Sequence, residues 1–174
     1  MANARQLALI EEFVSLCDAA SIPCWLRGGW AMDFFLGRVT REHEDIDLFV
    51  WMQDAPVLAH ALKQAGFIEQ GGPPPDAQRD FTKDGEQVQV ALLALNQRGQ
   101  VVVAGGQAAG TPWPEGMLAS PAGRIGDVVS PIVNPRVQVE IKENFPAWRP
   151  DLPLGAKHQA DIACLRDALA HSDG

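Results

Sequence analysis

Two aspartates separated by a single residue are the strongest candidates for chemistry in this sequence. Asp45 and Asp47 stand at the start of the apolar run 46–51, which has the composition of a β-strand. Side chains two positions apart in a strand point to the same face, so both carboxylates face one side. Paired carboxylates form an oxygen-rich site that suits Mg²⁺, whose remaining ligands are commonly substrate phosphates. A solvated acidic turn is the alternative interpretation of an isolated Asp-x-Asp pair.

A pair of glycines stands about 17 residues before the aspartates. Gly28 and Gly29 separate the short apolar run 24–26 from a predicted helix over 30–36. Without side chains they let the backbone approach a ligand and leave amide groups at a helix N-terminus, where phosphate oxygens are attracted. A plain tight turn is the alternative. A phosphate-binding turn followed by metal-binding carboxylates is what phosphoryl or nucleotidyl transfer requires, because the catalysis is mostly positioning and charge neutralisation.

Three basic side chains are candidate phosphate contacts. Arg41 and His43 lie just before the acidic pair, and Lys157 stands in the first turn of the predicted helix 156–170. Each has an alternative interpretation, because isolated arginines and histidines are commonly surface or structural groups and a first-turn lysine is usually solvated. The sequence therefore predicts nucleotide binding by these residues only in combination with the glycines and aspartates.

The elements that must position these residues follow from hydrophobic periodicity and turn signals. The expected helices are 5–20, 30–36, 55–65, 135–144 and 156–170. The expected strands are 24–26, 46–51, 81–83, 87–95 and 101–103, with short strands and loops over 105–135. Helices that alternate with strands first, and a strand meander later, predict an α+β fold with a mixed sheet flanked by helices, in a single domain spanning 1–174.

Composition limits the classes of function. The chain has 174 residues, of which 47% are hydrophobic and 21% charged, as in an ordinary globular domain. A formal net charge of −8 disfavours binding to bulk nucleic acid and favours cationic partners. The sequence contains neither a membrane-spanning run nor a signal-peptide profile, which predicts a cytoplasmic protein. We expect the three cysteines, Cys17, Cys24 and Cys164, to be reduced core thiols.

The segment around the glycines and aspartates resembles a known family. The matching residues are Gly28-Gly29-Trp30, Asp33, Gly37-Arg38, Thr40-Arg41, His43 and Asp45-Ile46-Asp47. They are similar to the signature of the small antibiotic nucleotidyltransferases, which include lincosamide nucleotidyltransferases and aminoglycoside 2″-adenylyltransferases, within the polymerase-beta-like superfamily. The resemblance is densest over 22–49. It continues more loosely over 88–95 and in the last helix, where Lys157, His158 and Asp161 fit the closing Lys-x-x-x-Asp pattern.

The resemblance implies an activity. It implies Mg²⁺-dependent transfer of a nucleoside monophosphate from an NTP, with ATP expected, to a hydroxyl of a small antibiotic, with release of pyrophosphate. Carried over by position, Gly28 and Gly29 would hold the triphosphate and Asp45 and Asp47 would bind the metal ions. Lincosamides and aminoglycosides both carry protonated amines, which suits an acidic chain without choosing between them.

One position departs from the family pattern. The family has a third carboxylate in an apolar-Asp-apolar triplet, where it ligates a metal and acts as base, and the corresponding triplet here has Gln89 at its centre. Glutamine offers a neutral carbonyl oxygen to a metal but cannot accept a proton. Glu86 and Asp84 lie at odd offsets from Gln89, so in a regular strand they do not share its face. A catalytically weak or silent protein that binds nucleotide or another protein is therefore the second hypothesis.

Overall fold

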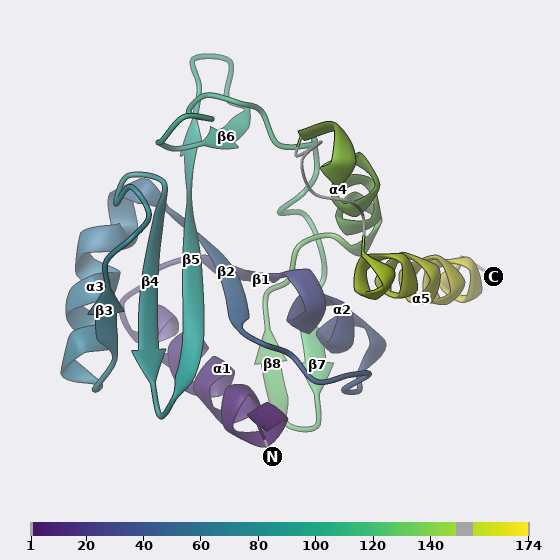
Figure 1. Cartoon of the computed structure of the whole chain (residues 1–174), viewed down its shortest axis with the longest axis horizontal. Coiled ribbons are helices and arrows are strands. Elements are labelled where there is room, and N and C mark those ends of the chain that lie inside the picture. Colours follow the sequence, from purple (N-terminus) through teal and green to yellow (C-terminus); the bar gives the residue numbers. More distant parts are fainter. Residues whose placement is uncertain (1, 149–154, 174) are drawn as a thin grey trace.

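The computed structural model of the chain describes residues 2–148 and 155–173, with the backbone alone for 145–148 (Figure 1). The helices are α1 (Ala2–Ala19), α2 (Gly28–Leu36), α3 (Ala55–Gln64), α4 (Pro135–Trp148) and α5 (Ala156–Ser172), with a 3₁₀ turn η1 (Met52–Asp54). The strands are β1 (Cys24–Arg27), β2 (Ile46–Trp51), β3 (Ile68–Gln70), β4 (Gln78–Lys83), β5 (Glu86–Leu95), β6 (Val101–Val103), β7 (Gly123–Ile125) and β8 (Val128–Ser130). The expected α+β class is confirmed.

The main sheet is mixed and has the order β1-β2-β5-β4-β3, with β6 added to the end of β5. β2 and β5 are parallel, and the other neighbours are antiparallel. A hairpin joins antiparallel strands, whereas parallel strands need a longer connection. Here α3, β3 and β4 form that connection between β2 and β5, and β5 lies on the side of β2 opposite β1. This order places β2, which carries Asp47, between β1 and β5.

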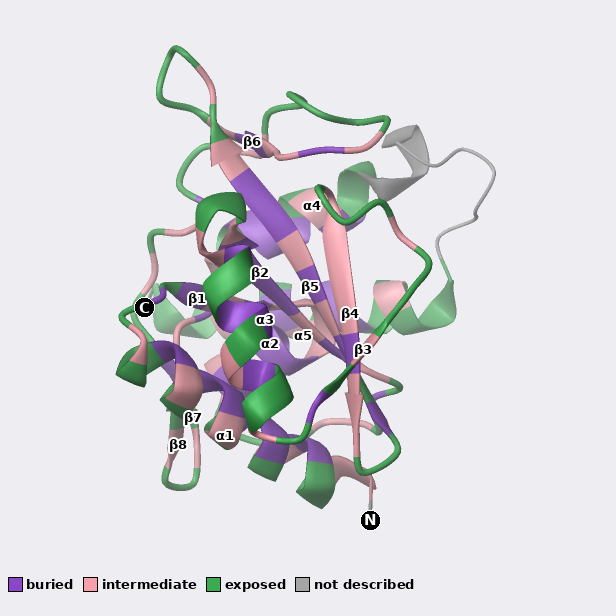
Figure 2. Cartoon of the chain, turned by 90° about the vertical axis from the view of Figure 1, so that its left-hand side faces the viewer, coloured by how far each residue is buried: buried purple, intermediate pink, exposed green. Residues whose placement is uncertain are grey.

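One face of the sheet is buried under α1 and α3, whose inward stripes are coloured as buried in Figure 2. Leu48 on β2 and Val90 on β5 pack there with Phe13 of α1 and Leu62 of α3. These side chains recur every second residue in the strands and every third or fourth residue in the helices, as the two geometries require. The core therefore fixes which residues of β2 and β5 point to the opposite face.

The second face of the sheet, called here the open face, carries the polar residues of interest. Phe49 and Leu93 on this face are covered by Met117 and Val133. The positions nearer the start of β2 are only half-buried, and Asp47 is among them. In Figure 1 helices α4 and α5 lie beyond β1 and α2, on the side of the molecule away from β4. Helix α5 packs against α2 and α4 through a small cluster that includes Leu165.

Most expected elements form, and the differences are local. The short strand β3 and the first half of β4 were not expected, because 68–70 and 78–80 are too short and too polar to display an alternating pattern. The strands expected within 105–135 are the β7–β8 hairpin. Cys17 and Cys24 are buried free thiols and Cys164 is a half-buried one. Within the described ranges no helix combines the length and the apolar character needed to cross a membrane.

Candidate active site

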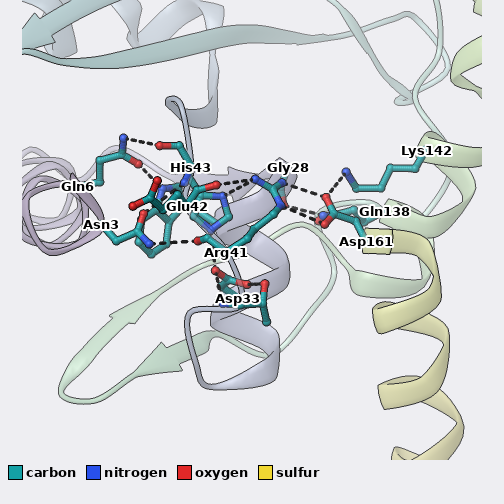
Figure 3. A network of polar contacts seen from close by, with 12 residues as sticks. Asn3, Gln6, Gly28, Asp33, Arg41, Glu42, His43, Gln138, Lys142 and Asp161 are labelled. Atoms are coloured by element: carbon teal, nitrogen blue, oxygen red, sulfur yellow. Dashed lines mark hydrogen bonds and ion pairs between the residues drawn. The ribbon is translucent and has the colours of Figure 1, made fainter. Parts of the chain in front are cut away.

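The glycine turn joins the end of β1 to the start of α2. Gly28 has a φ of 68°, a left-handed conformation that residues with a side chain rarely adopt. A Cβ at this position would lie 3.3 Å from the Asp47 carboxylate, so the turn passes close to the acidic pair. The carbonyl of Gly28 accepts a hydrogen bond of 2.6 Å from Nε2 of Gln138 on α4 (Figure 3). The turn is therefore held between β2 and α4.

Gly29 is needed for a reason that the sequence did not reveal. A Cβ at this position would lie 2.5 Å from Nη2 of Arg41 and 2.6 Å from Nδ1 of His43. Contacts of that length are sterically forbidden, so a side chain here would displace both residues. The space into which a Cβ of residue 29 would project is therefore filled by the side chains of Arg41 and His43.

Asp45 and Asp47 lie together, as their spacing predicted. Asp45 immediately precedes β2 and Asp47 is its second residue, and the two carboxyl groups interact directly. Burial raises the pKa of Asp47 to about 6; the charge of Arg27 opposes this rise, and Asp45 adds to it. Two carboxylates held this close repel each other, and a cation between them relieves the repulsion.

Gln89 lies next to Asp47 in the sheet, in the position that the family pattern gives to its third carboxylate. The two residues are partners in the parallel pairing of β2 with β5. On the other side of Gln89, the antiparallel pairing of β5 with β4 places Asp80 as its partner. Glu86, one of the two acids considered as substitutes, accepts a hydrogen bond from Gln6 and pairs with Arg5 on the helical side of the sheet.

His43 is a buried residue whose two ring nitrogens both have partners. Nε2 lies 2.6 Å from Oδ2 of Asp33, and Nδ1 lies 3.1 Å from Nη1 of Arg41. A guanidinium can only donate, so Nδ1 accepts that bond and Nε2 carries the proton given to Asp33. Thr40 completes the anchor with two hydrogen bonds to the same carboxylate. The geometry thus gives His43 the task of orienting Arg41.

Arg41 links the segment before β2 to the last helix. Its Nε and Nη2 donate to the two oxygens of Asp161 on α5 at 3.2 Å and 3.0 Å, a fork that matches the carboxylate (Figure 3). Nη1 donates to the carbonyl of Glu42 and to His43. Among the described residues four of its five N–H donors have partners, which leaves one on Nη2.

Lys142 on α4 joins the same cluster, and the sequence did not predict it. Its ammonium lies 3.3 Å from Oδ2 of Asp161, and its side chain is only 8% exposed. Burial lowers the pKa of Lys142, and Asp161 opposes the change. Gln138 and Lys142 are four residues apart on α4, so they share one helical face. That spacing of two polar residues among apolar ones was the available signal.

Two adjoining cavities surround the acidic pair. The glycine-turn cavity, of about 80 Å³, is lined by Gly28, Gly29, Arg41, Asp45, Asp47 and Lys157 among others. The aromatic cavity, of about 290 Å³, is lined by Phe49, Trp113, Val133 and Ile141 among others. Both share Arg27, Gly28, Asp47, Lys142 and His158. A larger groove of about 650 Å³ lies elsewhere, near Arg124 and Arg136, and no carboxylate lines it.

The predicted site residues therefore gather around the glycine-turn cavity, with one exception. Gln89 does not line either cavity and reaches the site only as the sheet neighbour of Asp47. Lys157 lines the cavity from an exposed position at the start of α5. Burial and the nearby Lys142 and Lys157 hold the pKa of His158 below its ordinary value, which favours the neutral ring.

A family model for aminoglycoside-2″-adenylyltransferases matches residues 9–142. The chain belongs to that family. Its similarity to individual members is concentrated in the signature segment: a 2″-aminoglycoside nucleotidyltransferase of Klebsiella pneumoniae and one of Escherichia coli are each 51% identical over 46 residues. Those alignments span 26% of this chain and 26% of each relative, about a quarter of their length.

Solved structures of related proteins share the fold of this family member over nearly its whole length. The antibiotic-resistance factor ANT(2″)-Ia aligns with a TM-score of 0.77 at 22% identity, covering 97% of this chain and 86% of that one. Its complex with adenylyl-2″-tobramycin gives 0.76 at 21% identity, covering 97% and 92%. The lincosamide adenylyltransferase LnuA with bound lincomycin gives 0.72 at 19% identity, covering 91% and 96%.

The donor set at the acidic pair suits one hard divalent cation. No group of three or more histidine, cysteine or acidic side chains within the described ranges is arranged to hold a metal ion. Asp45 and Asp47 supply two carboxylates whose mutual repulsion a cation would relieve, and Gln89 beside them offers an amide oxygen. Oxygen ligands of this kind suit Mg²⁺, provided that water and a substrate complete its coordination shell.

Proposed function

We propose that this member of the family transfers the nucleoside monophosphate of ATP, with Mg²⁺, to a hydroxyl group of a small cationic antibiotic. The observation that carries the proposal is the convergence of Asp45 and Asp47 with a helix N-terminus and basic side chains around one cavity. Polyanionic triphosphates require such a combination, because the metal ligands and the phosphate contacts must act on the same group. Mg²⁺, when bound, neutralises negative charge on the phosphates during transfer.

In the proposed reaction the acceptor oxygen forms a bond to the α-phosphorus, and the bond from that phosphorus to the pyrophosphate oxygen breaks. The acceptor proton leaves to solvent or to a protein base. The N-terminus of α2, Lys157 and the free N–H of Arg41 would hold the departing pyrophosphate. In-line displacement requires the hydroxyl to approach from the opposite side. With the pyrophosphate at the N-terminus of α2, which follows β1, the hydroxyl would approach from the β5 side of β2, the side of Gln89.

The acceptor class rests on two supports. The relatives of known structure bind adenylyl-2″-tobramycin in one case and lincomycin in the other. The chain itself carries a net charge of −8, which attracts protonated amines. Tobramycin and lincomycin are therefore the first acceptors to test.

Gln89 favours a second candidate, a protein of this fold that binds nucleotide with little or no transfer. A positioned base typically contributes about 10²- to 10⁴-fold to the rate, and an amide cannot supply it. Asp80 on β4 is the antiparallel partner of Gln89 and lies one strand further from Asp47. Nucleotide binding without transfer is the behaviour that this candidate predicts.

Pyrophosphate release distinguishes the two candidates. The protein would be incubated with ATP, Mg²⁺ and either tobramycin or lincomycin, and release would be compared with and without acceptor. Acceptor-dependent release that is lost in Asp47→Asn and retained in Asp127→Asn, an exposed acid of the β7–β8 turn, would support transfer at this site. Mg²⁺-dependent ATP binding without release with any acceptor would favour the second candidate, and absence of ATP binding would contradict both.

A further inference from the structure

Arg27 is a cation at the centre of the site that neither the motif nor the spacing argument singled out. It is the last residue of β1, and its antiparallel partner in the sheet is Asp47. Its guanidinium lies over the ring of Phe49, 4.7 Å from the ring centroid, so the side chain lies along the open face. Arg27 lines both the glycine-turn cavity and the aromatic cavity, at the point where they join.

The residues on the two sides of Asp47 carry less negative charge than a site for two metal ions requires. Arg27 is its neighbour on β1, and Gln89 is its neighbour on β5. Two divalent ions held about 4 Å apart need a bridging carboxylate and further anionic ligands on each ion. Among the described residues Asp45 supplies the carboxylate that interacts with Asp47, and the exposed Glu44 also lines the glycine-turn cavity. The guanidinium of Arg27 opposes a second divalent ion beside Asp47 by repulsion.

Arg27 also has the free donors that a phosphate needs. Arg41 has a single N–H left, and Lys142 is paired with Asp161. Within the described part of the chain the Arg27 guanidinium makes no hydrogen bond to another residue; it lies over the face of Phe49 and lines both cavities. A guanidinium fork matches two phosphate oxygens and is more weakly hydrated than an ammonium, so it suits a half-buried position.

We propose that Arg27 binds the α-phosphate of the nucleotide and replaces the positive charge of a second metal ion, so that the site works with one divalent cation. The inference rests on the proposed function, because it requires a nucleotide at the acidic pair. It assigns to Arg27 the neutralisation of charge that builds on the transferred phosphate. In this proposal Gln89 stands beside Asp47 where a carboxylate ligand for the second metal ion would otherwise be needed.

Counting bound Mn²⁺ by electron paramagnetic resonance tests this assignment without catalysis. The protein would be titrated with Mn²⁺ in the presence of α,β-methylene ATP, which cannot undergo transfer. We expect one Mn²⁺ per protein in the natural chain and two in the double variant Arg27→Met with Gln89→Asp. Two Mn²⁺ ions in the natural protein would overturn the inference while leaving nucleotide binding, and the proposed function, intact. Absence of nucleotide binding would overturn the proposed function itself.

Single variants separate a phosphate contact from a structural role. Arg27→Met keeps an apolar stem over Phe49 but removes the charge, and it should weaken analogue binding by about 10-fold or more. Arg27→Lys should recover part of that loss, and Arg98→Met, in the exposed turn before β6, should have no effect. Thermal unfolding of each variant checks that the fold is retained. Unchanged analogue affinity in a folded Arg27→Met variant would contradict the assignment.

Discussion

Replacing Asp161 by asparagine should loosen the connection between α5 and the rest of the site. Its carboxylate is 2% exposed and accepts two hydrogen bonds from Arg41 and one from Lys142. Asparagine removes the negative charge and leaves the Lys142 ammonium, itself 8% exposed, without its counter-ion. Removing one partner from a buried pair costs about 3–5 kcal/mol when the other charge stays buried.

The structure places the expected cost at the lower end of that range. The Arg41 side chain is 26% exposed, so water recovers part of its lost interaction. We therefore expect a loss of about 3 kcal/mol, which corresponds to a fall in unfolding temperature of roughly 6–12 °C for a chain of this size. ATP affinity should fall as well, because Arg41 and Lys142 would lose the group that orients them.

Thermal unfolding followed by circular dichroism, together with calorimetric titration of ATP, measures both effects. The matched control is Asp167→Asn on the same helix, whose side chain is 79% exposed. Burial alone would raise the pKa of Asp161, but the Arg41 hydrogen bonds and the charge of Lys142 outweigh it and hold the pKa below the ordinary 3.8.

The pH dependence gives the Asp161 prediction a second test. The depressed pKa contributes stability that is present above 3.8 and is lost as pH falls through the lower folded value. The stability difference between the natural protein and Asp161→Asn should therefore be constant near neutral pH and should shrink as the pH falls below 3.8. An unfolding temperature of the variant equal to that of Asp167→Asn at neutral pH would refute the reasoning.

Three further outcomes are expected. Gly29→Ala should lower the free energy of unfolding by about 1–3 kcal/mol and weaken ATP binding, because its Cβ displaces Arg41. Gly71→Ala, where nothing lies within 4 Å of the added Cβ, should do neither, and thermal unfolding and ATP titration of both variants measure the difference. Gln89→Asp should raise pyrophosphate release by about 10²-fold or more, with a rate that rises with pH through the titration of the new carboxylate. Asp80→Asn should lower release by about 10-fold in the natural protein and little in Gln89→Asp, and equal effects in both backgrounds would exclude Asp80 as a base.

The parts of the fold that local patterns specify were predictable. Strand β2 is apolar except for Asp47, and α1 repeats its apolar residues at helical spacing, so each forms where expected. Asp45 and Asp47 come together because their spacing is local. Strand β3 has only three residues, with Ile68 64% exposed, and depends on pairing with β4 instead of on its own pattern. No local signal marks such a strand.

Contacts between distant segments account for what the sequence did not reveal about the site. Arg41 and Asp161 are 120 residues apart, and the hydrogen bonds between them require α5 to pack on α2. The position of Arg27 beside Asp47, and of Asp80 beside Gln89, follows from strand register. Register is set by how the sheet buries its other face, so a single sequence contains it only implicitly.

The distribution of charge is compatible with both an acidic chain and the proposed nucleotide substrate. The chain as a whole carries a net charge of −8, yet Arg27, Arg41, Lys142 and Lys157 all line the glycine-turn cavity. Glu44, Asp45 and Asp47 line the same cavity, so the proposed triphosphate would meet these cations beside the carboxylates proposed to hold its metal ion. The net negative charge of the whole chain disfavours extended nucleic acids and favours amines. Two of the four cations, Arg41 and Lys142, are paired with Asp161 of α5, so affinity at the proposed phosphate site should depend on how stably α5 packs. Stability of the last helix and affinity for nucleotide should therefore change together across variants of this cluster.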